Sequence, residues 1–122
     1  IEPEVTITIS DKAEAEAILL DEITKQCDAL AEGQDIMLKL TLPEVANLYK
    51  PLVDHPRVMR VVALSGGYER DEANTRLAQN TGIIASFSRA LTQGLSAQQT
   101  DAEFDAILGE TINSIHAASV AG

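Results

Sequence analysis

The sequence predicts an α/β fold, because short apolar segments alternate with amphipathic ones along the 122 residues. Four segments rich in Val, Ile and Leu have the length of strands, and they are Ile1 to Ile9, Ile36 to Leu42, Val58 to Leu64 and Ile83 to Ser88. Strands that are apolar along nearly their whole length and are separated by helices are typical of parallel sheets covered by helices. The length and the 45% apolar content predict a single domain over residues 1–122.

The first two helices are expected in the gaps that follow the first two strands. Ser10 can cap the N-terminus of a helix that runs toward Leu30 and ends near Gly33. A short helix is expected over Val45 to Val53, in a stretch that proline residues restrict.

Two further helices follow the third and fourth strands. One is expected from Arg70 to Gln79. The other begins at Thr100, which has capping-box spacing to Glu103. Its apolar side chains form one stripe at helical spacing, made of Phe104, Ile107, Leu108, Ile112 and Ile115.

Four strand and helix units are about half of an eightfold β/α barrel, which needs about 250 residues. We therefore predict a half-barrel. An open, doubly wound sheet of four parallel strands is the alternative architecture. The chain opens inside an apolar run without a Met or a leader pattern, so we expect it to be a piece of a longer parent.

Composition argues against several classes of function. The 19 acidic and 9 basic residues give a net charge of -10, which disfavours nucleic acid and acidic membrane surfaces as partners. The single Cys27 cannot form an internal disulfide, so a reducing, cytoplasmic location and an inert buried thiol are expected. His55 and His116 have no further ligand at metal-binding spacing, and neither a metal nor another cofactor is expected.

Lys39 is the candidate nucleophile. A period of two places it with Met37 and Thr41 on one face of its strand and places the leucines on the other. Removal of an ammonium group from water favours the free amine, which can attack a carbonyl to form a Schiff base. The alternative is an edge-strand lysine that discourages pairing with other strands, or one whose head reaches water.

Glu2 and Glu4 are candidate proton-transfer groups. On an extended strand they project to the same side, despite Pro3 between them. A carboxylate beside a reactive amine can shuttle protons during imine chemistry. The alternative is a pair of solvated acids at a frayed terminus.

Two strand ends could hold a phosphate. Ser65, Gly66 and Gly67 follow one strand, and glycine there allows the backbone N–H groups to approach an anion. Ser88 and Arg89 close the next strand with a hydroxyl and a guanidinium. A Ser-Gly-Gly turn without a ligand is the alternative. Packing is the expected role of the tyrosines, Tyr49 and Tyr68.

The sequence resembles the class I fructose-bisphosphate aldolases, most closely their bacterial branch with short chains. Five pieces carry the resemblance in family order, namely residues 1–5 (IEPEV), 37–41 (MLKLT), 47–50 (NLYK), 61–68 (VVALSGGY) and 85–89 (ASFSR), the last continuing into Ala90 and Leu91. Together they span nearly the whole chain.

The resemblance implies the carboxyl-terminal half, strands five to eight, of a TIM barrel from an enzyme that cleaves fructose bisphosphate without a metal. It implies that Lys39 is the Schiff-base lysine, that Glu2 is the proton-transferring glutamate and that Glu4 is its neighbour. Ser65, Gly66, Ser88 and Arg89 match the groups that hold the ketose phosphate. The family also uses an aspartate and a second lysine on earlier strands, before this chain begins.

Three functions remain open from the sequence. The first is a piece of a glycolytic lyase that acts on a phosphorylated sugar, with a homo-oligomeric parent. The second is a non-catalytic module that self-associates through exposed strand edges. The third is another Schiff-base barrel enzyme, such as a transaldolase-like protein.

Overall fold

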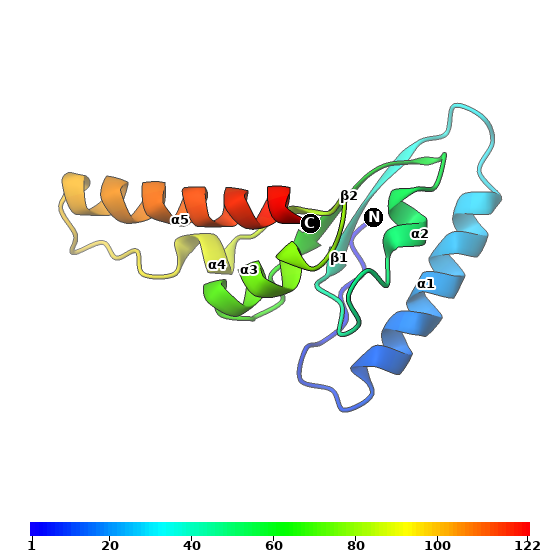
Figure 1. Ribbon diagram of the computed structural model, residues 1–122, viewed down its shortest axis with the longest axis horizontal. Coiled ribbons are helices and arrows are strands. Elements are labelled where there is room, and N and C mark those ends of the chain that lie inside the picture. The colour runs from blue at the N-terminus through cyan, green and yellow to red at the C-terminus, as the bar shows by residue number, and fades with distance from the viewer.

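The computed structural model describes residues 1–122 and contains a three-stranded parallel sheet in the order β1-β2-β3 (Figure 1). The strands are β1 (Ile36–Thr41), β2 (Val58–Leu64) and β3 (Ile84–Ala85). β1 pairs with β2 along its length, and the register irregularity between Ile36 and Met37 lies at its start. The predicted α/β class with parallel strands is confirmed.

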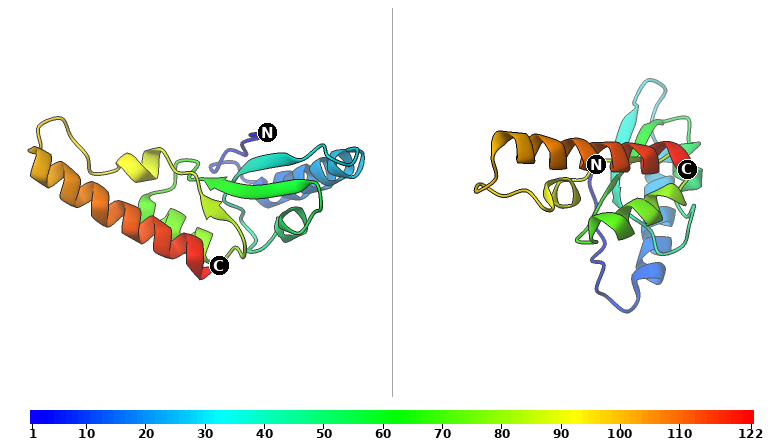
Figure 2. Two further views of the ribbon diagram at one scale, coloured as in Figure 1. Left: turned by 90° about the horizontal axis from the view of Figure 1, so that it is seen from above. Right: turned by 60° about the vertical axis from the view of Figure 1, so that its left-hand side comes forward.

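Five helices accompany the sheet: α1 (Lys12–Asp28), α2 (Lys50–Val53), α3 (Arg70–Ala78), α4 (Arg89–Thr92) and α5 (Asp101–Ala121). Figure 2 shows α2, α3 and α5 on one side of the strands and the N-terminal segment on the other. Leu38, Leu40 and Leu42 face the helices and are fully buried in one apolar core, against which Leu20 and Ile23 of α1 pack. None of the helices is long and apolar enough to cross a membrane.

The opposite face of the sheet is partly open. Met37 is half exposed there, and Lys39 on the same face of β1 is intermediate in exposure. The side chain of Ile7, from the N-terminal segment, comes close to Gly66 on this side. One face of the sheet therefore forms the core with the helices, and the other carries the polar residues singled out from the sequence.

The predicted strand from Ile1 to Ile9 is wrong, because only Ile1 forms a strand-like pairing. Its N–H donates to Met37 O at 3.1 Å and its carbonyl accepts from Lys39 N at 3.0 Å. Pro3 has no N–H to continue a ladder, and the N–H of Val5 donates instead to a side chain, Thr41 Oγ1, at 2.9 Å. The chain then turns at Ile7 and Thr8 toward α1.

The fourth predicted strand is present but shorter than expected. β3 covers two residues of the segment from Ile83 to Ser88, and one further bond from Ser86 N to Ala63 O, 2.7 Å long, extends its pairing. Phe87 then turns into the core, and the chain enters α4, a helix that the sequence did not predict.

The second helix is also shorter than expected. Asn47 has a φ of 63°, which breaks helical geometry. Pro51 is tolerated only in the first turn of a helix, so α2 begins at Lys50. The expected helix from Val45 to Val53 is therefore reduced to its last turn.

The two long helices lie where the sequence predicts them, with different caps. α1 begins one residue later than expected, with Asp11 rather than Ser10 at the N-cap, and it ends at Asp28, before the predicted boundary. α5 begins with the complete capping box of Thr100 and Glu103. The hydrogen bond from the Thr100 backbone lowers the pKa of Glu103, which keeps the carboxylate charged at the positive end of the helix.

The apolar stripe of α5 is only partly buried. Phe104 and Ile112 are exposed, whereas Thr111 and Ala118 are the buried residues of this helix. α5 extends well beyond the sheet in Figure 1, and residues 101–106 at its start are all exposed. α3 lies where it was predicted, and the buried side chains of that helix are Ala73 and Leu77.

Candidate functional site

A polar cavity of about 210 Å³ lies at the carboxyl ends of the strands. Seven of the eight site residues predicted from the sequence line it. The cavity wall consists of Glu2, Glu4, Lys39, Leu64, Ser65, Gly66, Ser86, Ser88 and Arg89. The loops that follow parallel strands meet at one edge of the sheet, which is why residues so far apart in the chain gather here.

Lys39 reaches into this cavity from the partly open face of β1. Its ammonium Nζ donates to Glu2 Oε2 at 3.2 Å. The Lys39 side chain is 29% exposed and that of Glu2 is 66% exposed. A primary amine with a carboxylate at hydrogen-bond distance, both open to a ligand, is an arrangement that allows proton transfer at the amine.

Glu2 and Glu4 both line the cavity, as their spacing of two residues predicts. Glu4 Oε1 lies 3.8 Å from Nη2 of Arg89. The N-terminal segment therefore places one carboxylate beside the lysine and the other beside the guanidinium, although it is not a regular strand.

The turn from Ser65 to Tyr68 supplies backbone groups to the cavity. It is closed by a bond from Tyr68 N to Ser65 O at 3.0 Å, and both central residues have positive φ, 65° at Gly66 and 106° at Gly67. A Cβ atom at Gly66 would lie 3.1 Å from Ile7 Cγ2 and 3.2 Å from Thr41 Cγ2. Glycine is therefore required here by conformation and by space.

Arg89 and Ser88 approach the same cavity from the start of α4. The Arg89 side chain is 68% exposed. A Cβ atom at Gly67 would lie 3.4 Å from Arg89 Nη1, so the guanidinium extends over the glycine turn. Gly67 itself lines an adjoining cavity with Arg89 rather than the one that contains Lys39.

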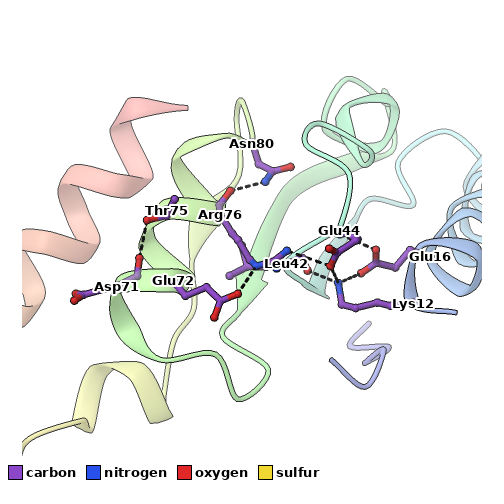
Figure 3. Close-up of polar contacts among 9 residues, drawn as sticks. All are labelled: Lys12, Glu16, Leu42, Glu44, Asp71, Glu72, Thr75, Arg76 and Asn80. Carbon is purple, nitrogen blue, oxygen red and sulfur yellow. Dashed lines mark hydrogen bonds and ion pairs between the residues drawn. The ribbon is translucent and has the colours of Figure 1, made fainter. Parts of the chain in front are cut away.

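A buried ion pair supports the loop after β1, and the sequence analysis missed it. Lys12 Nζ lies 2.5 Å from Glu16 Oε1 and donates to the carbonyl of Leu42 at 2.9 Å, while Glu16 Oε2 accepts from the Glu44 backbone at 2.8 Å (Figure 3). The Lys12 and Glu16 side chains are 5% and 0% exposed. Their i, i+4 spacing was a visible signal of a pair, but nothing local indicated burial.

A second group of contacts supports the loop after β2. Arg76 on α3 lies over the ring of Tyr68, with 4.3 Å between the guanidinium carbon and the ring centroid. The same guanidinium pairs with Glu44 at 3.2 Å and with Glu72 at 3.0 Å (Figure 3). Glu44 therefore links the loop after β1 to α3, and Tyr68 is a packing residue, as expected.

Other residues considered from the sequence lie away from the cavity. Cys27 is buried in the core, and desolvation raises the pKa of its thiol, as expected for an inert cysteine. Tyr49 is fully buried, which raises the pKa of its phenol, and its hydroxyl has no hydrogen-bond partner. His55 Nδ1 accepts from Arg57 N and its Nε2 lies 3.1 Å from Asp28. Nowhere do three or more His, Cys, Asp or Glu side chains gather in an arrangement that could hold a metal ion.

Ser86 is the polar residue of the cavity wall that the sequence analysis did not assign. It directly follows β3, where its backbone N–H still pairs with β2. Its position at the end of a parallel strand was the signal that could have identified it.

Comparison with known proteins identifies close relatives. No family model matches the chain. Along 120 residues, or 98% of the chain, it is 59% identical to a protein of Synechocystis sp. named fructose-bisphosphate aldolase class 1 and 53% identical to one of the same name from Porphyromonas gingivalis. The chain spans 40% of the length of each of these relatives. The chain is therefore homologous to two-fifths of a class 1 fructose-bisphosphate aldolase, as its motifs predicted.

Proposed function

We propose that this chain is the carboxyl-terminal part of a class I fructose-bisphosphate aldolase and carries its Schiff-base lysine. The observation that carries the proposal is the position of Lys39 Nζ, 3.2 Å from a Glu2 carboxylate oxygen in a cavity that also holds hydroxyls and an arginine. An amine, an acid and anion-binding groups in one cavity are what aldol chemistry on a sugar phosphate requires.

In this proposal Lys39 attacks the ketose carbonyl of fructose bisphosphate and forms a carbinolamine. Loss of water gives the imine, whose positive nitrogen withdraws electrons from the bond that breaks. Glu2, within hydrogen-bond distance of the amine, moves protons during formation and hydrolysis of the imine. As the C4 hydroxyl loses its proton, the bond between C3 and C4 breaks, glyceraldehyde 3-phosphate is released and the electron pair stays on the Lys39 adduct as an enamine. Protonation of C3 restores the imine, and hydrolysis of this imine releases dihydroxyacetone phosphate and frees the amine of Lys39.

The phosphate of the ketose would lie near the turn after β2 and the start of α4. No backbone hydrogen bond within the protein uses the N–H groups of Gly66 or Gly67, so these donors are free for an anion. Arg89 extends over the turn from the other side, and Ser65 and Ser88 add hydroxyls. A glycolytic role, a cytoplasmic location and a homo-oligomeric parent belong to the same proposal.

The strands of this chain would form the second half, strands five to eight, of a TIM barrel. α2, α3 and α5 lie on the leucine face of the sheet, whereas the face of Lys39 and Met37 is partly open. A doubly wound sheet would have helices on both faces. The position of Ile1, paired with the free edge of β1, corresponds to the end of one more strand.

Borohydride trapping of the full-length protein tests the proposal. Reduction in the presence of dihydroxyacetone phosphate is expected to leave a stable adduct on Lys39, detectable by peptide mass spectrometry. Lys39→Met should abolish the adduct and reduce turnover to below about a thousandth, because a covalent step loses its nucleophile. Lys25→Met is the control, since Lys25 is an exposed lysine on α1 that pairs with Asp21 and Glu22.

Absence of an adduct in the wild-type protein, or unchanged turnover in the Lys39→Met variant, would overturn the proposal. A panel of phosphorylated ketoses separates it from a transaldolase-like activity, which would favour monophosphates over fructose bisphosphate.

Self-association is a second candidate function of the chain by itself, and two apolar grooves favour it. One, of about 240 Å³, lies between α1 and β1 and includes Ile23, Leu30 and Ile36. The other, of about 480 Å³, lies between β3, α4 and α5. Titration with dihydroxyacetone phosphate distinguishes the two candidates. Saturable binding is expected for part of an aldolase, and no binding is expected for a non-catalytic module.

A further inference from the structure

We propose that Thr41 is a positioning residue that holds the carboxylates of Glu2 and Glu4 in register with Lys39. The inference rests on the proposed function and extends it to a residue that does not line the cavity. Thr41 is the last residue of β1 and is 1% exposed. It lies two positions after Lys39 and therefore on the same face of the strand.

The backbone of the N-terminal segment is attached to β1 at two residues, Ile1 and Val5, which lie on either side of its carboxylates. The carbonyl of Ile1 accepts from Lys39 N at 3.0 Å. Four residues later, the N–H of Val5 donates to Thr41 Oγ1 at 2.9 Å. Glu2 and Glu4 lie between these attachments, so the two hydrogen bonds determine the position of both residues relative to β1.

The hydroxyl of Thr41 does what a backbone ladder would do in a regular strand. Pro3 offers no N–H between the two attachments, so the segment cannot form a continuous ladder with β1. Without the bond to Thr41, the segment beyond Ile1 would lose its second attachment, and Glu4 would lose its fixed place beside Arg89.

Thr41 also contacts the proposed phosphate site through its other branch. Its methyl carbon Cγ2 would lie 3.2 Å from a Cβ atom built at Gly66, so it packs directly beneath the glycine turn. The hydroxyl and the methyl of one buried side chain thus contact both the segment that carries Glu2 and Glu4 and the glycine turn of the proposed phosphate site.

Thr41→Val and Thr41→Ser separate these contacts in the full-length protein. Valine keeps the shape and removes the acceptor, whereas serine keeps the acceptor and removes the methyl. In the valine variant, kcat is expected to fall about 10- to 100-fold with KM within about threefold of wild type, since a displacement near 1 Å can cost a hundredfold. The serine variant should recover most of kcat, because the bond to Val5 is retained.

Amide hydrogen exchange at Val5 gives a readout that does not depend on activity. Val5 should be protected in the wild-type protein and in Thr41→Ser, and its exchange should accelerate at least about tenfold in Thr41→Val as the bond is lost. If the valine variant does not fold, the wild-type and serine proteins still decide the point through this amide.

Three results would overturn the inference. They are wild-type kcat in Thr41→Val, an equal loss of kcat in the serine and valine variants, and unprotected exchange of Val5 in the wild-type protein. Borohydride trapping of the wild type is measured alongside. Absence of the trapped Lys39 adduct in the wild-type protein refutes the proposed function. A normal adduct together with any of the three results refutes only the role of Thr41.

Discussion

The buried ion pair between Lys12 and Glu16 yields a prediction about stability that can be worked from the structure. Glu16→Gln keeps the shape of the side chain and one oxygen that can accept from the Glu44 backbone. It removes the charge opposite Lys12 and places an amide NH2, a donor, where an accepting oxygen stood. Lys12 then keeps its bond to the Leu42 carbonyl and a more distant carboxylate, Glu44, at 3.9 Å.

Removal of one partner of a buried pair leaves an uncompensated charge and costs about 3–5 kcal/mol. Because Lys12 retains two polar neighbours, we expect the lower end, about 3 kcal/mol. For a domain of ordinary size this lowers the melting temperature by about 6–12 °C. The double variant Lys12→Met with Glu16→Leu replaces the pair by apolar side chains and leaves no unpaired charge. It is expected to cost about 1–3 kcal/mol, because the Leu42 carbonyl and the Glu44 N–H lose their partners.

Differential scanning calorimetry of the full-length protein measures the effect. Glu22→Gln is the matched control, because Glu22 lies on the same helix and pairs with Lys25 at 2.7 Å, but both side chains are more than half exposed. Its loss should cost less than about 1 kcal/mol. A Glu16→Gln variant that melts no lower than Glu22→Gln would refute the reasoning that burial makes this pair important.

Three further outcomes are expected. If the proposed function holds, Arg89→Ala should raise KM for fructose bisphosphate about tenfold. This is the lower range for a charge-assisted bond to phosphate, because Arg89 is largely exposed, and an unchanged KM would exclude Arg89 from the proposed phosphate site. Cys27 should react with iodoacetamide at pH 8 at least about tenfold more slowly in the native protein than in urea, because burial raises the pKa of its thiol. For the same reason this thiol contributes stability below about pH 8.5, and that contribution is lost as the pH rises further. The isolated 122-residue chain should dimerise or aggregate, which light scattering would show. In a coupled assay it should cleave fructose bisphosphate at less than about a thousandth of the rate of the full-length protein. A monomer with full activity would contradict the half-barrel proposal.

The sequence predicted best where local pattern and tertiary structure agree. β2 has the predicted bounds, Val58 to Leu64, because its apolar run is bounded by Pro56 and by the Ser-Gly-Gly turn. The capping box of Thr100 and Glu103 is a purely local device and is present in full. The gathering of the site residues followed from one topological rule, that parallel strands end at the same edge of the sheet.

The N-terminal segment could not be predicted in this way. Its composition is that of a strand, but the hydrogen-bond partner of each amide depends on the residues of β1 that lie beside the segment rather than on the segment itself. Val5 donates to a threonine hydroxyl where a strand would donate to a carbonyl. Glu2 and Glu4 still share one side, because a short extended stretch keeps the period of two even without a ladder.

The Lys12 and Glu16 pair shows a similar limit. Its i, i+4 spacing is common to many exposed helices, and α1 has such a pair in Lys25 and Asp21 as well. What buries the first pair is the loop after β1, which lies 30 positions away in the case of Leu42. Burial of a charge therefore depends on tertiary contacts that no local window contains.

The alternation along β1 makes the core and the candidate site depend on one register. Leu38 and Leu40 are fully buried against the helices. Lys39, which lies between them, faces the cavity, and Thr41, which follows them, faces the N-terminal segment. A slip by one residue would put the lysine into the core and the leucines onto the open face. Burial of the leucines therefore stabilises the register in which Lys39 faces the cavity. In the same register Thr41 faces Val5, and the hydrogen bond between them positions the segment that contains Glu2 and Glu4.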